Sequence, residues 1–160
     1  FIFGGGHVSQ ALVPVLASIG FSCTVVDDRA EFADPALFPQ AEAVYEADYE
    51  ALPADLGVTP DDYVCIMTRG HVGDYDVQRQ MLAIKPYYLG VIGSRRKLAF
   101  VKEKLLADGF TAAEIDACHA PIGLAISAVT PAEIAISIAA ELIAIRAKRE
   151  GREKSRYHKP

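Results

Sequence analysis

The sequence is poor in cysteine, with three in 160 residues, at positions 23, 65 and 118. An odd number of widely spaced cysteines supports neither a disulfide framework nor a zinc site, and no metal site is expected. Cys23 and Cys65 fall in apolar segments, where a thiol acts as a small hydrophobic side chain. This usage is typical of a reducing compartment, so we expect the protein to be cytoplasmic.

Long uncharged apolar runs and short catalytic motifs are also missing. The sequence has no run of about eighteen apolar residues without a charge, which argues against a membrane span. Cys-x-x-Cys, His-Glu-x-x-His and Gly-x-Ser-x-Gly do not occur, and no internal repeat is present. With 51% apolar residues the chain can bury a core in one domain. We place that domain at residues 1–150, followed by a basic tail at 151–160.

The net charge of −5 is unevenly distributed, because residues 146–160 carry seven basic and two acidic side chains. The acidic remainder argues against nucleic-acid binding. The basic end of the chain either contacts a partner or nucleic acid or is a solvated chain end, and we favour the last interpretation. The chain begins without methionine inside an expected strand, so we expect it to be part of a longer protein.

Short β-rich segments alternate with helical patterns along the chain. This alternation predicts an α/β fold, a doubly wound Rossmann-like parallel sheet with helices on both faces. We expect the strand order 3-2-1-4-5 and a long C-terminal helix. The expected strands cover residues 1–3, 23–27, 43–45, 63–68 and 88–92. The expected helices start near residue 7, cover 74–84 and 97–108, and include short ones at 49–56 and after residue 111.

The last helix has the clearest signals. Thr130 supplies an N-cap, Pro131 the first helical position and Glu133 the acid of a capping box. Isoleucine and leucine then occupy nearly the whole circumference of residues 134–145. A helix this apolar is expected to be buried on more than one side. We therefore expect an upstream region or a second subunit to cover it, and a homodimer.

The first expected strand leads into a glycine turn and a helix, and the second ends in an acid about twenty residues later, as in the dinucleotide-binding fingerprint. Ser9 stands at the third glycine position. Gly4 would permit the turn, Gly6 would let the backbone approach an anion, and the helix starting near His7 would offer free N–H groups to phosphate. Asp27 would bond a pair of ribose hydroxyls. The alternative is a structural turn that binds nothing.

Other strand ends would bring more polar groups to the same edge of the sheet. Ser94, Arg95 and Arg96 follow the fifth strand, where backbone N–H groups and guanidinium donors suit a second anionic group. The alternative is that these cations form only the solvated first turn of a helix, although the helix dipole disfavours cations there.

Arg69 and His71 follow the fourth strand, and we expect them to line the remaining wall of the pocket. His71 could equally brace its own loop, near Asp74. His119 follows Cys118, but adjacent side chains rarely face each other. We therefore expect His119 to contact a ligand rather than to form a catalytic pair with the cysteine, and we assign no catalytic residue.

Six motifs occur in order along residues 1–145. They are GGGHVSQAL at 4–12, VVDDR at 25–29, MTRGH at 67–71, GVIGSRRK at 90–97, HAPIGL at 119–124 and TPAEIA at 130–135. Together they resemble the C-terminal Rossmann domain of the XdhC/CoxI family, accessory proteins of xanthine dehydrogenase and related molybdenum hydroxylases.

The resemblance implies a maturation factor rather than an enzyme. Such a factor binds the molybdenum cofactor, as molybdopterin or its dinucleotide, protects it during sulfuration by a cysteine desulfurase, and passes it to the apo molybdenum hydroxylase. The family usually carries an additional N-terminal domain with a functional cysteine, which this chain does not contain.

Two other functions remain open from the residues alone. One is an NAD(P)-dependent oxidoreductase in which His71 or His119 donates a proton beside hydride transfer. The other is a non-catalytic dimeric interaction module in which the last helix forms the interface.

Overall fold

The computed structural model describes residues 1–70 and 72–152. The predicted ligand residue His71 and most of the basic tail therefore lie outside the described residues. The strands are β1 (Ile2–Phe3), β2 (Thr24–Asp27), β3 (Ala43–Glu46), β4 (Tyr63–Ile66) and β5 (Tyr88–Val91). The α-helices are α1 (His7–Ser18), α2 (Val72–Ile84), α3 (Arg95–Ala107), α4 (Ala112–Asp116) and α5 (Pro131–Arg149).

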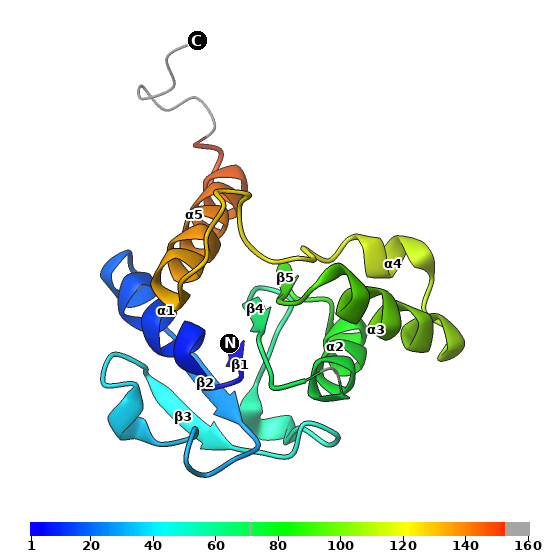
Figure 1. The fold of residues 1–160 in the computed structure, drawn as a ribbon, viewed down its shortest axis with the longest axis horizontal. Coiled ribbons are helices and arrows are strands. Elements are labelled where there is room, and N and C mark those ends of the chain that lie inside the picture. Colours follow the sequence, from blue (N-terminus) through cyan, green and yellow to red (C-terminus); the bar gives the residue numbers. More distant parts are fainter. Residues whose placement is uncertain (71, 153–160) are drawn as a thin grey trace.

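The five strands form one parallel sheet in the order β3-β2-β1-β4-β5, which confirms the predicted order (Figure 1). Because all strands are parallel, their carboxyl ends meet at one edge. The chain adds strands to one side of β1 and then returns to place β4 on its other side. Sheets of this kind bind ligands beyond the carboxyl ends at this reversal, between β1 and β4.

Helices cover both faces of the sheet (Figure 1). α1 and α5 lie together on one face, over a core that includes Leu12 and Ile138. α2 and α3 cover the other face, over a core that includes Met81 and Leu105. The strands between them carry apolar side chains on both sides, as expected for a parallel sheet buried between helical layers.

The predicted start of α5 is confirmed, because Thr130 and Glu133 form a complete capping box with a proline behind the cap. Ile138 is fully buried within the chain's own core. Ile136 and Ile143 are instead 52% and 40% exposed. Within the described residues, α1 and the sheet thus cover one side of α5 and leave its outer side uncovered.

The strands and helices deviate from the predictions mainly at their ends. The segment predicted as a short helix at 49–56 contains only a 3-10 turn, Ala54–Leu56, because Pro53 precedes it. β4 stops at Ile66, and Thr68 turns toward α2. His119 pairs with Gly90 beside β5, through His119 N–H to Leu89 O at 2.8 Å and Val91 N–H to His119 O at 2.9 Å. The sequence did not predict this short extension of the sheet.

Candidate functional site at the carboxyl edge of the sheet

The glycine turn after β1 packs tightly against the neighbouring loops. Gly4 has φ +107°, and a Cβ there would lie 2.2 Å from the carbonyl oxygen of Met67, at the end of β4. A Cβ on Gly5 would lie 2.2 Å from the carbonyl oxygen of Phe32. Only glycine fits these two positions, so the turn joins the loops after β1, β2 and β4 into one surface.

Gly6 differs from the two glycines before it. A Cβ on Gly6 would meet none of the described atoms within 4 Å, so the backbone faces open space. Gly6 is the N-cap of α1, and no described side chain caps the first amides of this helix. The first turn of a helix leaves N–H groups unpaired and carries the positive end of the helix dipole. With exposed His7 beside it, this point can receive an anion such as phosphate.

Ser9, the departure from the fingerprint, has a structural role. Its hydroxyl is buried and donates a hydrogen bond to the carbonyl oxygen of Gly4. The third residue of the motif therefore holds the turn through a hydrogen bond, where glycine would allow a closer helix–strand approach.

Asp27 is fully buried, and both of its carboxylate oxygens are engaged. Oδ2 accepts the Gly5 N–H at 2.7 Å and Arg29 Nη2–H at 3.0 Å, and Oδ1 accepts Arg29 Nε–H at 2.9 Å. Burial opposes ionisation, but the bonds from Arg29 and Gly5 outweigh it and hold the pKa of Asp27 below its usual value. A ribose or pterin group could reach Asp27 only by displacing one of these donors. What the structure describes is a brace between β2 and the glycine turn, and the ligand role stays a prediction.

The loops after β4 and β5 are joined by Asp74, in the first turn of α2. Its Oδ1 accepts the Thr68 N–H at 3.1 Å and the Thr68 hydroxyl at 2.5 Å, and its Oδ2 forms an ion pair with Lys97 in the first turn of α3. Asp74 is fully buried, and this burial outweighs the bonds from Lys97 and Thr68, so the pKa of the carboxyl is raised. The positive charge of Lys97 is thus neutralised by a carboxylate of the protein itself.

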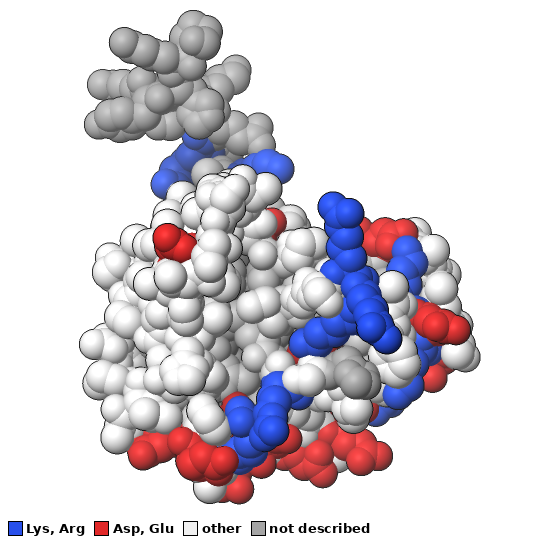
Figure 2. Space-filling model, in the orientation of Figure 1, with Lys and Arg blue, Asp and Glu red and all other residues white. Residues whose placement is uncertain are grey.

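The two arginines before Lys97 form no such ion pair with the described residues. Arg95, Arg96 and Arg69 are exposed, and each lacks a hydrogen bond or ion pair with the part of the chain that the structure describes. Ser94 caps α3 by accepting the Lys97 N–H at 3.3 Å. Figure 2 shows basic side chains gathered in the middle of one face, over α2, α3 and the loops that precede them, with acidic side chains at the rim.

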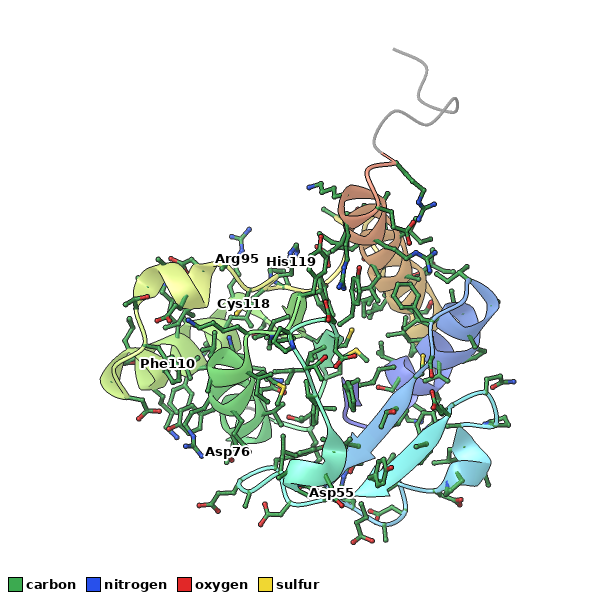
Figure 3. The ribbon with its side chains drawn as sticks, turned by 180° about the vertical axis from the view of Figure 1, so that it is seen from behind. Asp55, Asp76, Arg95, Phe110, Cys118 and His119 are labelled. Carbon is green, nitrogen blue, oxygen red and sulfur yellow. The ribbon has the colours of Figure 1, made fainter. Side chains whose placement is uncertain are left out.

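His119 and Cys118 diverge, as predicted for adjacent residues. The Cys118 thiol lies 3.5 Å from the amide nitrogen of Gln78 on α2, and burial raises its pKa. His119 Nδ1 lies 2.9 Å from Glu141 Oε1 on α5, on the opposite face of the sheet. The His119 imidazole, about a third exposed, also contacts the Tyr88 ring, with the ring centroids 4.6 Å apart and the planes tilted by 36°. Figure 3 shows both residues and Arg95 in the same region, between α4 and α5.

Glu141 is the polar residue that sequence reasoning missed. Besides His119, it accepts the Tyr88 hydroxyl at 2.6 Å and the Gly123 N–H at 2.7 Å. Burial opposes its ionisation, but these donors outweigh that effect and lower its pKa. The signal available was a single acid within the apolar run of α5, since a lone buried carboxylate requires partners.

The structure therefore places most of the predicted site residues along one edge of the sheet, but it does not bring all of them together in one pocket. Eight of them lie at the carboxyl edge, in loops or at the adjoining ends of strands and helices: Gly4, Gly6, His7, Asp27, Arg69, Ser94, Arg95 and Arg96. His119 lies beside β5 and is oriented toward α5. A cavity of about 350 Å³ at the opposite edge, where β1, β2 and β4 begin, is lined partly by Phe21 and Tyr63 and contains none of the predicted residues.

The residues that the structure describes include no group of three or more His, Cys, Asp or Glu side chains placed to bind a metal ion. Among them, no helix is both long and apolar enough to cross a membrane.

Comparisons with known proteins agree with the resemblance seen in the motifs. YqeB, an uncharacterized protein of Escherichia coli (strain K12), is 33% identical over 146 residues, which are 91% of this chain and 27% of YqeB. A protein of Bacillus subtilis (strain 168), described as a probable xanthine dehydrogenase subunit, is 28% identical over 91% of this chain and 42% of its own length. The chain thus spans less than half of these relatives.

A solved structure supports the same relationship. The crystal structure of a xanthine dehydrogenase from Bacillus halodurans superposes with a TM-score of 0.77 and 31% sequence identity, over 96% of this chain and 44% of that one. The family model described as the XdhC Rossmann domain matches residues 1–142, which include every strand and most of α5. The chain therefore belongs to the XdhC family, and the parallel sheet with its glycine turn and arginine-bearing loops is the Rossmann domain of that family.

Proposed function

We propose that this domain acts in an accessory factor for a molybdenum hydroxylase of the xanthine dehydrogenase type. It binds the molybdenum cofactor, as molybdopterin or its dinucleotide, while the cofactor is sulfurated by a cysteine desulfurase and inserted into the apo-enzyme. The domain holds its cargo and performs no chemistry on it. The link to xanthine dehydrogenase comes from the family and from the names of the relatives.

The observation that carries the proposal is a set of unpaired donors along the carboxyl edge of the sheet, with an open helix start after β1 and unpaired arginines after β4 and β5. Gly6 faces free space at the N-terminus of α1, and Arg69, Arg95 and Arg96 have no partner among the described residues. Guanidinium groups and free backbone N–H groups are the usual donors for phosphate in proteins. The terminal phosphate of molybdopterin, or the diphosphate of its dinucleotide form, fits this donor set.

The residues present match the phosphate end of the cofactor better than its metal end. In the client enzyme the molybdenum centre supplies the redox chemistry of hydroxylation. Here Gly6 and the first amides of α1 would bind phosphate, while Arg95 and Arg96 would bind a second anionic group of the cofactor. His119, fixed by Glu141, offers its second ring nitrogen as a further polar contact.

The brace on Asp27 argues against the NAD(P)-dependent oxidoreductase. Rossmann dehydrogenases use the acid at this position to accept the ribose hydroxyls of NAD. Here Arg29 and Gly5 already occupy that carboxylate. The nicotinamide cofactor would have to break the hydrogen bonds that hold the glycine turn.

The test is a comparison of ligands under anaerobic conditions. Molybdopterin released from a molybdenum enzyme is titrated against the domain, with NADH titrated in parallel. Replacing both Arg95 and Arg96 by alanine should weaken molybdopterin binding about tenfold or more, because each charged hydrogen bond contributes roughly 1.5–3 kcal/mol.

Arg79→Ala is the matched control, since this arginine lies within α2, away from the helix starts. It should leave the affinity unchanged. Binding of NADH in preference to molybdopterin would contradict the proposal, as would equal affinity of the double variant and the unaltered domain.

A further inference from the structure

The outer side of α5 is an apolar surface that the chain leaves uncovered. Ile136 and Ile143 are 52% and 40% exposed, and they lie on one side of the helix because they are seven residues apart. Alanine occupies the other positions of this stripe, at 132, 140 and 147. Monomeric proteins seldom expose a continuous apolar stripe of this length, so the surface marks a contact site.

The loop before α5 widens this surface. Leu124, Ile126 and Val129 are 44%, 50% and 81% exposed. The loop is held along the helix by two hydrogen bonds, Leu124 N–H to Ser137 O at 3.2 Å and Ser137 Oγ–H to Leu124 O at 2.7 Å. The apolar side chains are therefore presented from an anchored backbone. In Figure 2 the region over α1 and α5 is almost free of charged side chains, unlike the other half of the molecule.

The order of residues along the stripe is symmetric. Counted from its centre near Ala140, Ile136 and Ile143 lie on either side, and Ala132 and Ala147 lie beyond them. In two antiparallel copies of α5, each Ile136 would therefore meet the partner's Ile143. The small alanine at the centre would let the helix backbones approach closely, since the distance between helices follows the side chains at the contact.

Charge at the two ends favours the same orientation. Glu133 is exposed in the first turn of α5 and Lys148 in the last, with the apolar stripe between them. An antiparallel pair brings the acidic start of one helix to the basic end of the other, and it aligns the helix dipoles head to tail. A parallel pair would bring like charges together.

We propose that the exposed face of α5, with Leu124, Ile126 and Val129, binds a second copy of this chain about a two-fold axis near Ala140. Such an interface is isologous, because the same patch of both copies meets itself. It leaves the carboxyl edge of the sheet free in each copy, so it does not depend on the proposed ligand.

The first experiment measures the mass of the 160-residue chain in solution by light scattering across a range of concentrations. The expected mass is twice the 17.3 kDa of one chain. Changing Ile136 and Ile143 together to glutamate should give a folded monomer whose thermal midpoint no longer depends on protein concentration, because both side chains are exposed within the monomer and only the stability gained by association is lost. Leu106→Glu is the matched control, because Leu106 on α3 is also 44% exposed, and it should remain dimeric.

The second experiment tests the register. Ala140→Cys should form an intermolecular disulfide on mild oxidation, because the two copies of this residue meet at the axis. Ala99→Cys, on the exposed side of α3, should not. A monomeric unaltered chain would overturn the proposal and assign the surface to another part of a longer chain or to a different protein. A dimer that persists in the Ile136/Ile143 double variant, or that fails to link through position 140, would also overturn it.

Discussion

Asp74 at the start of α2 and Lys97 at the start of α3 form an ion pair in which the Asp74 side chain is fully buried and the Lys97 side chain is 20% exposed. Each helix start follows a different strand, β4 or β5. The pair therefore fixes the spacing of two loops that carry predicted ligand residues. Of the three cations after β5, Lys97 is therefore engaged in a structural ion pair, and Arg95 and Arg96 remain available for a ligand.

Breaking this pair should destabilise the domain. Asp74→Asn keeps the shape of the side chain but removes the ion pair with Lys97 and weakens the two hydrogen bonds from Thr68. Because burial opposes the ionisation of Asp74, the lost ion pair costs less than its Coulomb attraction, and we expect a loss of about 1–2 kcal/mol in the free energy of unfolding, measured with urea. Asp116→Asn, which breaks the exposed pair with Lys102, should cost about 0.5 kcal/mol or less. Equal costs would show that burial does not strengthen the Asp74 pair.

The contribution of Asp27 to the free energy of unfolding should depend on pH. Because its pKa is lowered in the folded state, its stabilising effect is present above the unfolded value, about 3.9, and is lost as the pH falls through the lower folded value. The destabilisation caused by Asp27→Asn should therefore be large at neutral pH and should shrink below about pH 4. A destabilisation that stays constant down to the acid transition would contradict the brace by Arg29.

The raised pKa of Asp74 predicts the opposite change of stability with pH. A carboxyl with a raised folded pKa takes up its proton more readily in the folded state, so its ionisation reduces stability as the pH rises through that pKa. The destabilisation caused by Asp74→Asn should therefore be smallest near neutral pH, where the unaltered carboxyl is ionised, and should grow on mild acidification as that carboxyl takes up its proton. A destabilisation by Asp74→Asn that shrinks on mild acidification, as expected for Asp27→Asn, would contradict the raised pKa.

The glycine turn allows a matched pair of substitutions. Gly4→Ala places a methyl group against Met67 O in a left-handed conformation, so we expect a loss of several kcal/mol or failure to fold. Gly6→Ala meets open space at an ordinary φ of −69°, and should cost less than about 1 kcal/mol. If phosphate binds at this helix start, Gly6→Ala should still weaken molybdopterin binding. Unchanged affinity would place the phosphate elsewhere.

Glu141 should stabilise the join between α5 and the edge of the sheet. Glu141→Gln retains size but places an amide beside Gly123 N–H and His119, so one donor is left without an acceptor. The expected cost is about 1–3 kcal/mol in urea unfolding. Glu103→Gln, at an exposed position on α3, is the control and should change little. A neutral Glu141→Gln variant would show that the carboxylate does not hold this region.

The sequence was sufficient for the order of the strands and for the capping boxes at Thr111 and Thr130, since both depend on local patterns and topology rules. It could not show which charges would pair inside the protein. Lys97 and Arg95 are two residues apart in one basic run, yet only Lys97 reaches Asp74, on a separate helix. Asp27 matched the motif for a ribose-binding acid, but the conformation of Arg29, two residues later, determines whether its oxygens are free.

The residues 119–122 were equally hard to place from sequence. His119 pairs with β5, and Ile122 N–H bonds to Val91 O at 2.9 Å, although the stretch contains proline and carries no alternating pattern. Its position depends on α4 and α5, which fix its two ends, rather than on its own propensity.

The pairing of His119 with β5 also affects the behaviour of the protein at high concentration. Unpaired backbone groups on an outer strand can template the addition of a strand from another molecule, which leads to aggregates. At β5 a segment of the same chain already uses several of these groups. At the other outer strand, β3 is four residues long, ends in Glu46 and follows Glu42, so its charges repel a copy of itself. Both outer strands are thus protected against edge-to-edge association, and self-association should be confined to helical surfaces.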